Sequence, residues 1–242
     1  MKQTFLTIVS QQRIADNVME MCLEGDTSGI TASGQFVNIK VEGLFLRRPI
    51  SVCDYTENSL TLVYKIVGEG TRLMAEYPAG TVLDVLTGLG NGYDTSLSGD
   101  APLLIGGGVG VPPMYNLCKT LVAEGKHPTV VLGFNSKGDV FYEKEFEALG
   151  ATVTVTTADG SYGVKGFVTD ALPTTYSHFY CCGPEPMLKA VYRATSTSGQ
   201  FSFEERMGCG FGACMGCSCK TITGYKRICK EGPVLQKEEI LW

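Results

Sequence analysis

The sequence predicts an α+β protein with three domains: an antiparallel β-barrel, a parallel α/β domain and a small C-terminal cysteine-loop domain. Two changes of pattern along the 242 residues support this prediction. Short alternating stretches separated by turns are replaced near position 99 by apolar runs that alternate with helical patterns. From about position 200 neither pattern continues. We therefore expect domains at residues 1–98, 99–199 and 200–242.

The composition excludes several classes of protein. A net charge of −5 with no cluster of Lys and Arg argues against a nucleic-acid-binding surface. No run approaches the roughly 18 apolar residues of a membrane span, and the first ten residues lack the apolar core of a secretory signal. We therefore expect a cytoplasmic protein, in which ten cysteines are metal ligands and buried thiols rather than disulfides.

Residues 1–98 contain six short stretches with the alternation of half-buried strands. Gly and Pro turns separate them, and only Thr71–Glu76 has the pattern of a helical turn. Six strands with little helix predict a small antiparallel barrel. The expected strands are Phe5–Val9, Val18–Leu23, Gln35–Val41, Ile50–Tyr55, Ser59–Ile66 and Thr81–Leu86.

Residues 99–199 repeat a strand followed by a helix four times, which predicts a parallel sheet with helices on both faces. The expected strands are Pro102–Ile105, Thr129–Phe134, Thr152–Thr157 and His178–Cys182. The expected helices are Pro112–Ala123, Tyr142–Leu149, Phe167–Ala171 and Pro184–Ala194. The remaining tail offers one strand candidate, Gln200–Glu204, and a segment so rich in Gly and Cys needs a staple to be stable.

The cysteine spacing in residues 200–242 predicts which bound group stabilises this segment. Cys209, Cys214 and Cys217 follow the C-x4-C-x2-C spacing of plant-type [2Fe–2S] ligation, and Cys229 supplies a fourth thiol. Two irons need four converging thiolates, so the loop must keep turning and direct backbone N–H groups at the sulfurs. The loop has residues without a Cβ at Gly208, Gly210, Gly212 and Gly216. The sequence therefore predicts a [2Fe–2S] cluster on these four cysteines.

Cys219 complicates the ligand set because it lies two positions after Cys217. We interpret Cys219 as a buried non-ligand, since the ligand spacing favours the other four cysteines. A structural zinc site is the main alternative, although only Cys214 and Cys217 form the C-x2-C pair typical of zinc. Disulfides would need an oxidising compartment.

Two segments of the predicted barrel suit a flavin nucleotide. The segment Arg47-Arg48-Pro49-Ile50-Ser51 offers a guanidinium for a pyrophosphate and a hydroxyl for a ring nitrogen. The segment Tyr64–Val67 leads into Gly68-Glu69-Gly70-Thr71, a glycine turn and helical turn with free N–H groups for a phosphate. The alternative interpretation is a surface Arg pair followed by an ordinary hairpin.

Two segments of the predicted sheet suit a dinucleotide. A buried strand leads into a glycine loop with Gly107, Gly108 and Gly110 and then a proline-started helix, which lets a pyrophosphate approach the helix N-terminus. Cys182, Gly183 and Pro184 follow the fourth strand at the edge that faces the ligand crevice, and a small thiol before Gly leaves room for a planar ring. The alternatives are a tight turn without ligand and a buried cysteine.

No catalytic residue is predicted. The two histidines, His127 and His178, have no partner in the sequence, so acid–base or nucleophilic catalysis is not expected. After the second strand of the sheet, Asp139 can accept a hydrogen bond from a ribose hydroxyl, as in NAD sites, whereas Lys137 can attract the 2′-phosphate of NADP.

The order of these motifs resembles the ferredoxin reductase superfamily along most of the chain. Within it, the stretch ERMGCGFGACMGCSC at positions 205–219 is similar to the electron-transfer subunit of NAD-dependent (class 1B) dihydroorotate dehydrogenase. The resemblance extends from Leu46 to Cys229, and the cysteine loop is its most specific part. The segment between Cys217 and Cys229 is short for that family.

The resemblance implies one FAD, one [2Fe–2S] cluster and an NAD site. It also implies a partner, an FMN-containing catalytic subunit that oxidises dihydroorotate, in a heterotetramer with two copies of each chain. Electrons would pass from FMN through the cluster and FAD to NAD⁺ in de novo pyrimidine (UMP) biosynthesis. By this resemblance Cys182 lies near the nicotinamide, and the FAD is held by Arg48, Pro49, Ile50, Ser51, Lys65, Ile66, Val67, Gly70 and Thr71.

Two other interpretations stay open. FAD and cluster subunits of NADH-dependent ferredoxin:NADP⁺ oxidoreductases and sulfide dehydrogenases share the fold but have a different partner. Those relatives tend to replace the first cluster Cys with Asp, so Cys209 favours dihydroorotate. A non-catalytic redox sensor or zinc-stapled binding protein would show neither flavin nor iron–sulfur absorbance.

Overall fold

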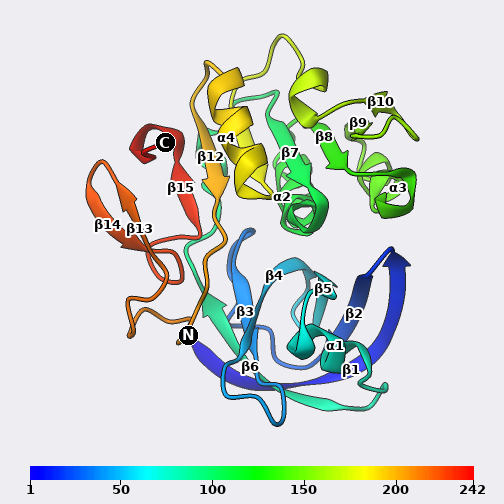
Figure 1. Ribbon diagram of the computed structural model, residues 1–242, viewed down its shortest axis with the longest axis vertical. Coiled ribbons are helices and arrows are strands. Elements are labelled where there is room, and N and C mark those ends of the chain that lie inside the picture. Colours follow the sequence, from blue (N-terminus) through cyan, green and yellow to red (C-terminus); the bar gives the residue numbers. More distant parts are fainter.

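The computed structural model describes residues 1–242 and contains a closed barrel, a seven-stranded sheet and a two-stranded sheet. In Figure 1 the barrel forms the lower half of the molecule and the seven-stranded sheet the upper half. The C-terminal segment, drawn in orange and red, lies beside both. None of the helices has the length and apolar character that crossing a bilayer requires.

The predicted antiparallel barrel is confirmed. Its six strands close in the order β1-β2-β5-β4-β3-β6, and its interior is filled by apolar side chains such as Leu6, Met21, Leu62 and Val85. The only helix within it is α1 (Glu69–Ala75), between β5 and β6. The strands are β1 (Lys2–Ala15), β2 (Val18–Glu24), β3 (Phe36–Ile39), β4 (Arg48–Tyr55), β5 (Ser59–Lys65) and β6 (Val82–Leu89).

Strand β1 is much longer than the expected Phe5–Val9. Its second half carries polar side chains from Ser10 to Arg13, which lack the alternation that predicts a strand. These residues nevertheless pair with β2 after an irregularity between Ile8 and Ser10. Hydrogen bonding to a neighbouring strand thus extends β1 beyond its apolar part.

The predicted parallel sheet with helices on both faces is also confirmed. Strands β7 (Leu103–Gly107), β8 (Thr129–Phe134), β9 (Thr152–Thr157), β10 (Val164–Lys165) and β11 (Phe179–Cys182) are parallel. Helices α2 (Val111–Ala123) and α3 (Glu143–Ala148) pack on one face through Met114, Leu117 and Phe146. Helix α4 (Glu185–Ala194) packs on the other face, and the expected helix Phe167–Ala171 is a single 3-10 turn at Val168–Ala171.

The C-terminal segment adds two strands to this sheet. Strand β12 (Gly199–Ser202) pairs parallel to β11, and β15 (Val234–Gln236) pairs antiparallel to β12. Between them, β13 (Ser218–Thr221) and β14 (Gly224–Arg227) form a hairpin. Because pairing with a distant strand stabilises β12 and β15, this segment has support beyond its cysteines. The boundary near residue 200 stays a prediction.

Polar contacts join the barrel to the sheet. Helix α2 packs on β4, where Lys119 Nζ lies 2.8 Å from Asp54 Oδ2 and Asn116 Nδ2 donates to Asp54 Oδ1 at 3.0 Å. Ser33 Oγ donates to Asn116 Oδ1 at 2.6 Å. Tyr142 OH, after β8, donates to Glu20 Oε2 of β2 at 2.7 Å. These contacts fix the orientation of the carboxyl edge of the sheet against the barrel.

Candidate cofactor sites

The four predicted cluster ligands lie as two pairs of thiols. Cys209 is beside Cys214, and Cys217 is beside Cys229. A [2Fe–2S] cluster places two protein ligands on each of two irons, so two pairs match its requirement. No group of three or more Cys, His, Asp or Glu side chains surrounds one position as ligands of a single metal ion would. The thiol arrangement therefore fits the predicted two-iron cluster.

The two pairs differ in their exposure. Cys217 and Cys229 are buried in the same apolar core as Phe36 of β3, whereas Cys214 is exposed and Cys209 is half-buried. A cluster held here would have one iron inside the fold and the other near the surface. The surface side is therefore the side that another protein can reach.

Backbone N–H groups point at the cysteine sulfurs, as the glycine-rich loop predicts. The N–H of Ala213 donates to Cys209 Sγ at 3.2 Å, and the N–H of Gly216 donates to Cys214 Sγ at 3.5 Å. In the inner pair, the N–H of Cys229 donates to Cys217 Sγ at 3.4 Å. Such bonds stabilise negative charge on sulfur and raise the potential of an iron–sulfur cluster.

Burial and hydrogen bonding change the pKa of Cys209 and the pKa of Cys229 in opposite directions. Burial alone would raise the pKa of the Cys209 thiol, but N–H groups of its own loop lower it to about 6. Burial raises the pKa of the Cys229 thiol to about 12, and its hydrogen bond with Cys217 adds to the rise. Because ligands bind as thiolates, Cys209 is already prepared for metal, whereas Cys229 releases its proton on binding.

Cys219 joins neither pair. It lies in β13 and packs against the apolar core, and its Sγ is directed at the carbonyl of Lys220 at 3.8 Å. Burial raises the pKa of the Cys219 thiol, and the nearby carboxylates of Glu205 and Glu239 add to the rise. This placement supports the prediction that Cys219 is not a ligand.

Sequence reasoning missed the residue that closes the cysteine loop. Arg227 Nη1 donates to the carbonyl of Gly212 at 2.6 Å, which ties the loop to the turn that carries Cys229. Glu231 holds the guanidinium in place, with Oε2 accepting from Arg227 Nε at 2.9 Å. This ion pair lowers the pKa of Glu231 to about 2. The ion pair between Arg227 and Glu231 spans only four positions of the sequence, but no spacing rule predicts the hydrogen bond from Arg227 to Gly212.

In the predicted flavin site, the structure brings Arg48 to the start of α1. A Cβ on Gly70 would lie 2.1 Å from Arg48 Nε, so only glycine allows the guanidinium to lie there. The neighbouring Arg47 is instead paired with Asp84 through two 2.9 Å contacts. Arg48 donates to the carbonyl of Leu46 and forms no ion pair, so it is the arginine available to a pyrophosphate, and the cradle at Gly70 fits the predicted FAD.

The other predicted flavin residues follow the same edge of the barrel. Pro49 and Ser51 lie opposite Asn38 and Phe36 of β3, and Ile50 packs against the barrel core. Lys65 ends β5, with Ile66 and the exposed Val67 after it. The hydroxyl of Thr71 accepts from the N–H of Val67 at 3.0 Å and donates to the carbonyl of Gly68 at 3.1 Å, so it shapes the turn.

The predicted nucleotide loop lies against the flavin strands. The turn Gly108–Gly110, between β7 and α2, contacts β5. A Cβ on Gly110 would lie 2.2 Å from the carbonyl oxygen of Cys182, and one on Gly107 would lie 2.3 Å from Met187 Sδ. The loops after β7 and β11, which carry the predicted NAD residues including Gly183 and Pro184, therefore touch at the carboxyl edge of the sheet.

Cys182 lies at this edge next to Tyr93 and Ser202. Burial raises the pKa of its thiol to about 12, so the side chain is a neutral thiol at physiological pH. A neutral, small group suits the neighbourhood of a planar ring, as predicted, and does not act as a base or nucleophile.

Asp139 and Lys137, the residues considered for a preference between NAD and NADP, both contact other residues of this chain. Asp139 Oδ2 accepts from the N–H and hydroxyl of Ser136 at 3.1 and 2.9 Å. The Lys137 ammonium lies 5.8 Å from the centre of the Tyr162 ring. The Asp139 carboxylate thus stabilises the turn Lys137–Asp139, in which it lies.

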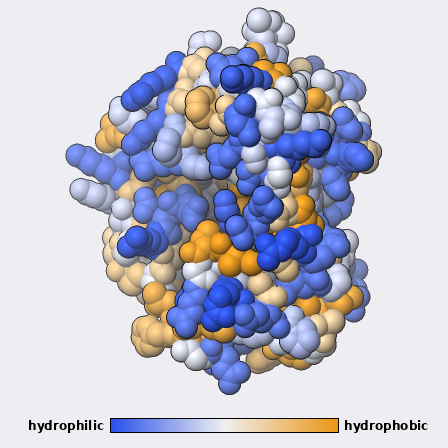
Figure 2. Space-filling view, turned by 45° about the vertical axis from the view of Figure 1, so that its right-hand side comes forward, coloured by the Kyte–Doolittle hydropathy of each residue, from blue (hydrophilic) through white to orange (hydrophobic).

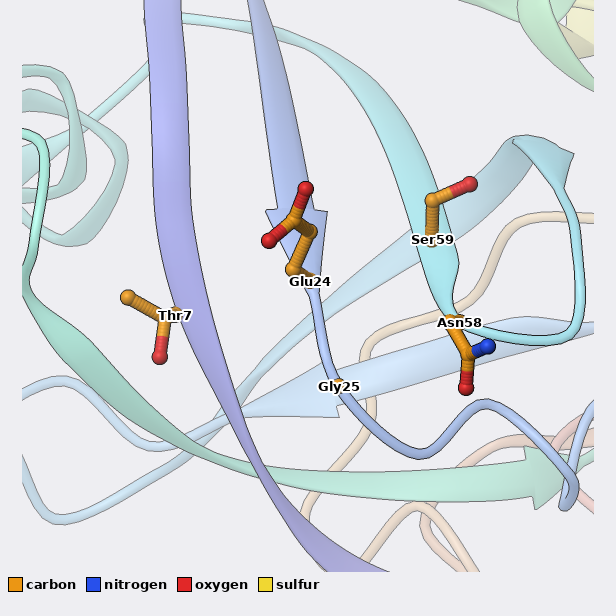
Figure 3. A pocket seen from close by; sticks show the side chains of 5 residues that line it. All are labelled: Thr7, Glu24, Gly25, Asn58 and Ser59. Atoms are coloured by element: carbon orange, nitrogen blue, oxygen red, sulfur yellow. The ribbon is translucent and has the colours of Figure 1, made fainter.

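Surface features outside these sites are of two kinds. Figure 2 shows hydrophobic side chains gathered near mid-height on one face, between the half with the sheet and the half with the barrel. Figure 3 shows an open hollow on the barrel wall, between the middle of β1, the end of β2 and the start of β5. It contains no predicted site residue and is lined by Thr7, Glu24, Gly25, Asn58 and Ser59.

Two family models match the chain. The iron-sulfur cluster binding domain of dihydroorotate dehydrogenase B matches residues 204–241, and the oxidoreductase NAD-binding domain matches residues 104–193. The solved structure of a ferredoxin NADP⁺ reductase from Neisseria gonorrhoeae shares the fold, with a TM-score of 0.69 and 16% identity over 80% of this chain and 90% of that chain. Fold and site together define an NAD-linked oxidoreductase subunit with an iron–sulfur domain.

Curated relatives identify the family. The electron transfer subunit of dihydroorotate dehydrogenase B (NAD⁺) from Bacillus pumilus is 45% identical, over 99% of this chain and 98% of the relative. The Geobacillus sp. subunit is 44% identical over 100% and 99%. The chain belongs to the family of electron transfer subunits of NAD⁺-dependent dihydroorotate dehydrogenase B, which confirms the resemblance.

The alternative relatives share the fold at lower identity. The structure of the NADH-dependent reduced ferredoxin-NADP oxidoreductase has a TM-score of 0.88 and is 30% identical, over 98% of this chain and 90% of that chain. The chain is more similar in sequence to the dihydroorotate dehydrogenase subunits, as the cysteine at position 209 predicts.

Proposed function

We propose that this chain passes electrons from an FMN-containing dihydroorotate dehydrogenase subunit through a [2Fe–2S] cluster and FAD to NAD⁺. The observation that supports the proposal most is that the three candidate sites adjoin. The glycine turn at Gly108–Gly110 contacts β5, and Gly110 touches Cys182. The carbonyl of Cys209 is bonded to β3, the strand next to β4. Adjoining cofactors are what a chain of electron transfers requires.

The chain's own residues bind and orient the groups. The thiolates of Cys209, Cys214, Cys217 and Cys229 hold the cluster, and the Arg48 guanidinium binds the pyrophosphate of FAD. When bound, FAD exchanges a hydride with the nicotinamide and single electrons with the cluster. Ser51 and the strand ends of β4 and β5 orient the flavin ring. The neutral thiol of Cys182 packs beside the nicotinamide, and the glycine loop gives room to the dinucleotide phosphates.

The partner subunit binds at the exposed side of the cysteine loop in this proposal. Phe211 and Met215 are 43% and 53% exposed on that loop, beside the outer pair of thiols. Exposed apolar side chains there suit a protein interface better than solvent. We place the FMN subunit on this surface, in a heterotetramer with two copies of each chain, and we place the complex in the cytoplasm.

The test of the proposal compares the chain alone with the assembled complex. Alone, and loaded with its cofactors, the chain should oxidise NADH with an artificial acceptor but should not oxidise dihydroorotate. Adding the FMN subunit should produce dihydroorotate-dependent NADH formation. Dihydroorotate oxidation by the isolated chain, or NADH oxidation without bound flavin, would contradict the proposal.

A variant locates the interface. Phe211→Asp should weaken co-elution with the FMN subunit, because a carboxylate is costly to bury in an apolar interface. Iron, flavin and NADH oxidation by the isolated chain should stay unchanged. Phe167→Asp is the matched control, since Phe167 is 69% exposed near β10, far from the cysteine loop in Figure 1. Unchanged assembly of the Phe211 variant would place the interface elsewhere.

A further inference from the structure

Strand β3 stands between the cluster segment and the flavin strand. All four of its residues are buried, although a barrel strand normally has one solvent face. Val37 and Ile39 point into the barrel core. Phe36 and Asn38 alternate to the outside, where Phe36 packs in one core with Cys217 and Cys229. The outer face of β3 is thus the platform on which the cluster segment lies.

Asn38 makes the contact with a cluster ligand on this platform. Its Nδ2 donates to the carbonyl of Cys209 at 3.4 Å. The next residue of the loop is Gly210, with φ at +78°, and a Cβ there would lie 2.3 Å from Asn38 Nδ2. The side-chain amide therefore lies directly under the Cys209–Gly210 backbone, and only glycine permits that approach.

Asn38 also lies next to β4, the strand that carries the predicted flavin residues. Asn38 lies opposite Pro49 of β4, between the positions opposite Arg48 and Ile50. Its backbone carbonyl accepts a hydrogen bond from Arg47 Nη1 at 3.3 Å, and Arg47 is fixed by Asp84. One residue therefore connects the start of the flavin segment with the first cluster ligand.

The stability of the barrel does not explain why position 38 carries a polar amide side chain. Asn38 is 1% exposed, and its Oδ1 has no hydrogen-bond partner. A buried acceptor without a partner is destabilising, and a leucine of similar size would avoid that cost. The polar side chain is explained by what its donor holds, the backbone of Cys209.

We propose that Asn38 is a positioning residue for electron transfer, whose amide fixes the Cys209 end of the cluster loop beside the flavin strand. The inference rests on the proposed function, since it takes the cluster to be held by the four cysteines and FAD by β4. Releasing the carbonyl of Cys209 loosens the loop in which Ala213 and Cys214 donate to its sulfur at 3.2 and 3.4 Å. Weaker N–H bonds to sulfur make a cluster harder to reduce.

The matched control is Asn91, a second amide that ties the C-terminal segment to the barrel. Its Nδ2 donates to the carbonyl of Val234 at 2.7 Å, and its Oδ1 accepts from the N–H of Val234 at 3.1 Å. It anchors the segment after Cys229 and does not contact the cluster loop. Asn91→Ala therefore removes an anchor without removing the proposed positioning contact.

The experiment compares Asn38→Ala and Asn91→Ala in the full chain loaded with FAD and cluster. In Asn38→Ala, amide exchange in residues 209–214 should rise about five- to tenfold, as for loss of one hydrogen bond. The cluster's midpoint potential should become more negative, and stopped-flow reduction of the cluster after NADH should slow while flavin reduction keeps its rate. In Asn91→Ala, only exchange near residues 231–234 should rise. Asn38→Leu, which keeps the volume, should behave as Asn38→Ala.

Each other outcome contradicts the inference in a distinct way. Equal shifts of potential in both Ala variants would show that Asn38 is only an anchor. An unchanged potential and rate in both Asn38 variants would show that the contact does not position the cluster, and loss of the cluster from both would make Asn38 a retention residue instead. If the wild-type chain itself holds no flavin or cluster, the proposed function fails before the variants are compared.

Discussion

In the cluster loop, three ligands lie between positions 209 and 217, whereas the flavin residues come from β4, the end of β5 and the start of α1. The loop needs little of the fold to bring Cys209 beside Cys214, since its own turns do so. The flavin cradle exists only because β4 and α1 come together and place Arg48 on Gly70. One site is local in sequence and the other is tertiary.

The difference extends to the thiols. In the cluster loop, backbone N–H groups lower the pKa of Cys209 to about 6, so a charged ligand is favoured. At the flavin and nucleotide edge, burial raises the pKa of Cys182 to about 12 and keeps the thiol neutral. The same side chain is thus prepared for metal in one region and for packing against an uncharged ring in the other.

The largest effect is expected at the cluster loop, the site that is local in sequence. Cys214→Ser and Cys217→Ser, one from each pair, should each abolish the cluster, because each variant removes one of the two protein ligands of one iron. Cys219→Ser should keep it, since Cys219 joins neither pair. Iron content and the reduced-state paramagnetic signal measure the outcome. Loss of the cluster in Cys219→Ser with retention in Cys229→Ser would show that the fourth ligand is Cys219.

Local patterns predicted the barrel, the parallel sheet and the cysteine loop, because strand alternation and ligand spacing can be read from residues that are close together in the sequence. Asn38 was not predicted, since its partner Cys209 is 171 residues away and only the fold brings them together. Strand β15 was missed for the same reason, as its pairing with β12 depends on the path of the whole C-terminal segment. Arg227 was missed because its bond to Gly212 has no sequence signature.

The second prediction concerns pH and tests the contrast between the thiols. In the cofactor-free chain at pH 8, alkylation of Cys182 should be on the order of a thousandfold slower in the native than in the urea-unfolded state. The raised pKa is the reason: an unfolded thiol ionises near its ordinary value of 9.0, whereas the native Cys182 stays protonated until about 12. Mass spectrometry of the labelled peptide measures the rates. Native labelling that rises with a midpoint near pH 9 would contradict the burial argument.

The third prediction concerns the tertiary site. Arg48→Ala should weaken FAD retention about ten- to a hundredfold, which corresponds to a charge-assisted contact of about 1.5–3 kcal/mol. Flavin per chain after gel filtration measures retention, and circular dichroism checks that the barrel is folded. Arg72→Ala is the control, because Arg72 lies on α1 but is exposed and paired with Glu76. Full flavin occupancy in Arg48→Ala would remove Arg48 from the site.

The smallest effect is expected where the loop meets the rest of the fold. Glu231→Gln removes the charge that holds Arg227 against the carbonyl of Gly212. The pKa of Glu231 is lowered to about 2, so its contribution is present above the ordinary value of 4.5 and is lost as the pH falls toward 2. At pH 7 the variant should therefore lose its cluster to a chelator only about two- to fivefold faster, as expected for a partly exposed ion pair. Glu238→Gln is the control, on an exposed residue of the same C-terminal segment that is not paired with Arg227, and it should not change the half-life of the visible absorbance. A loss as complete as that in Cys214→Ser would show that the cluster loop depends on tertiary contacts as much as the flavin cradle does.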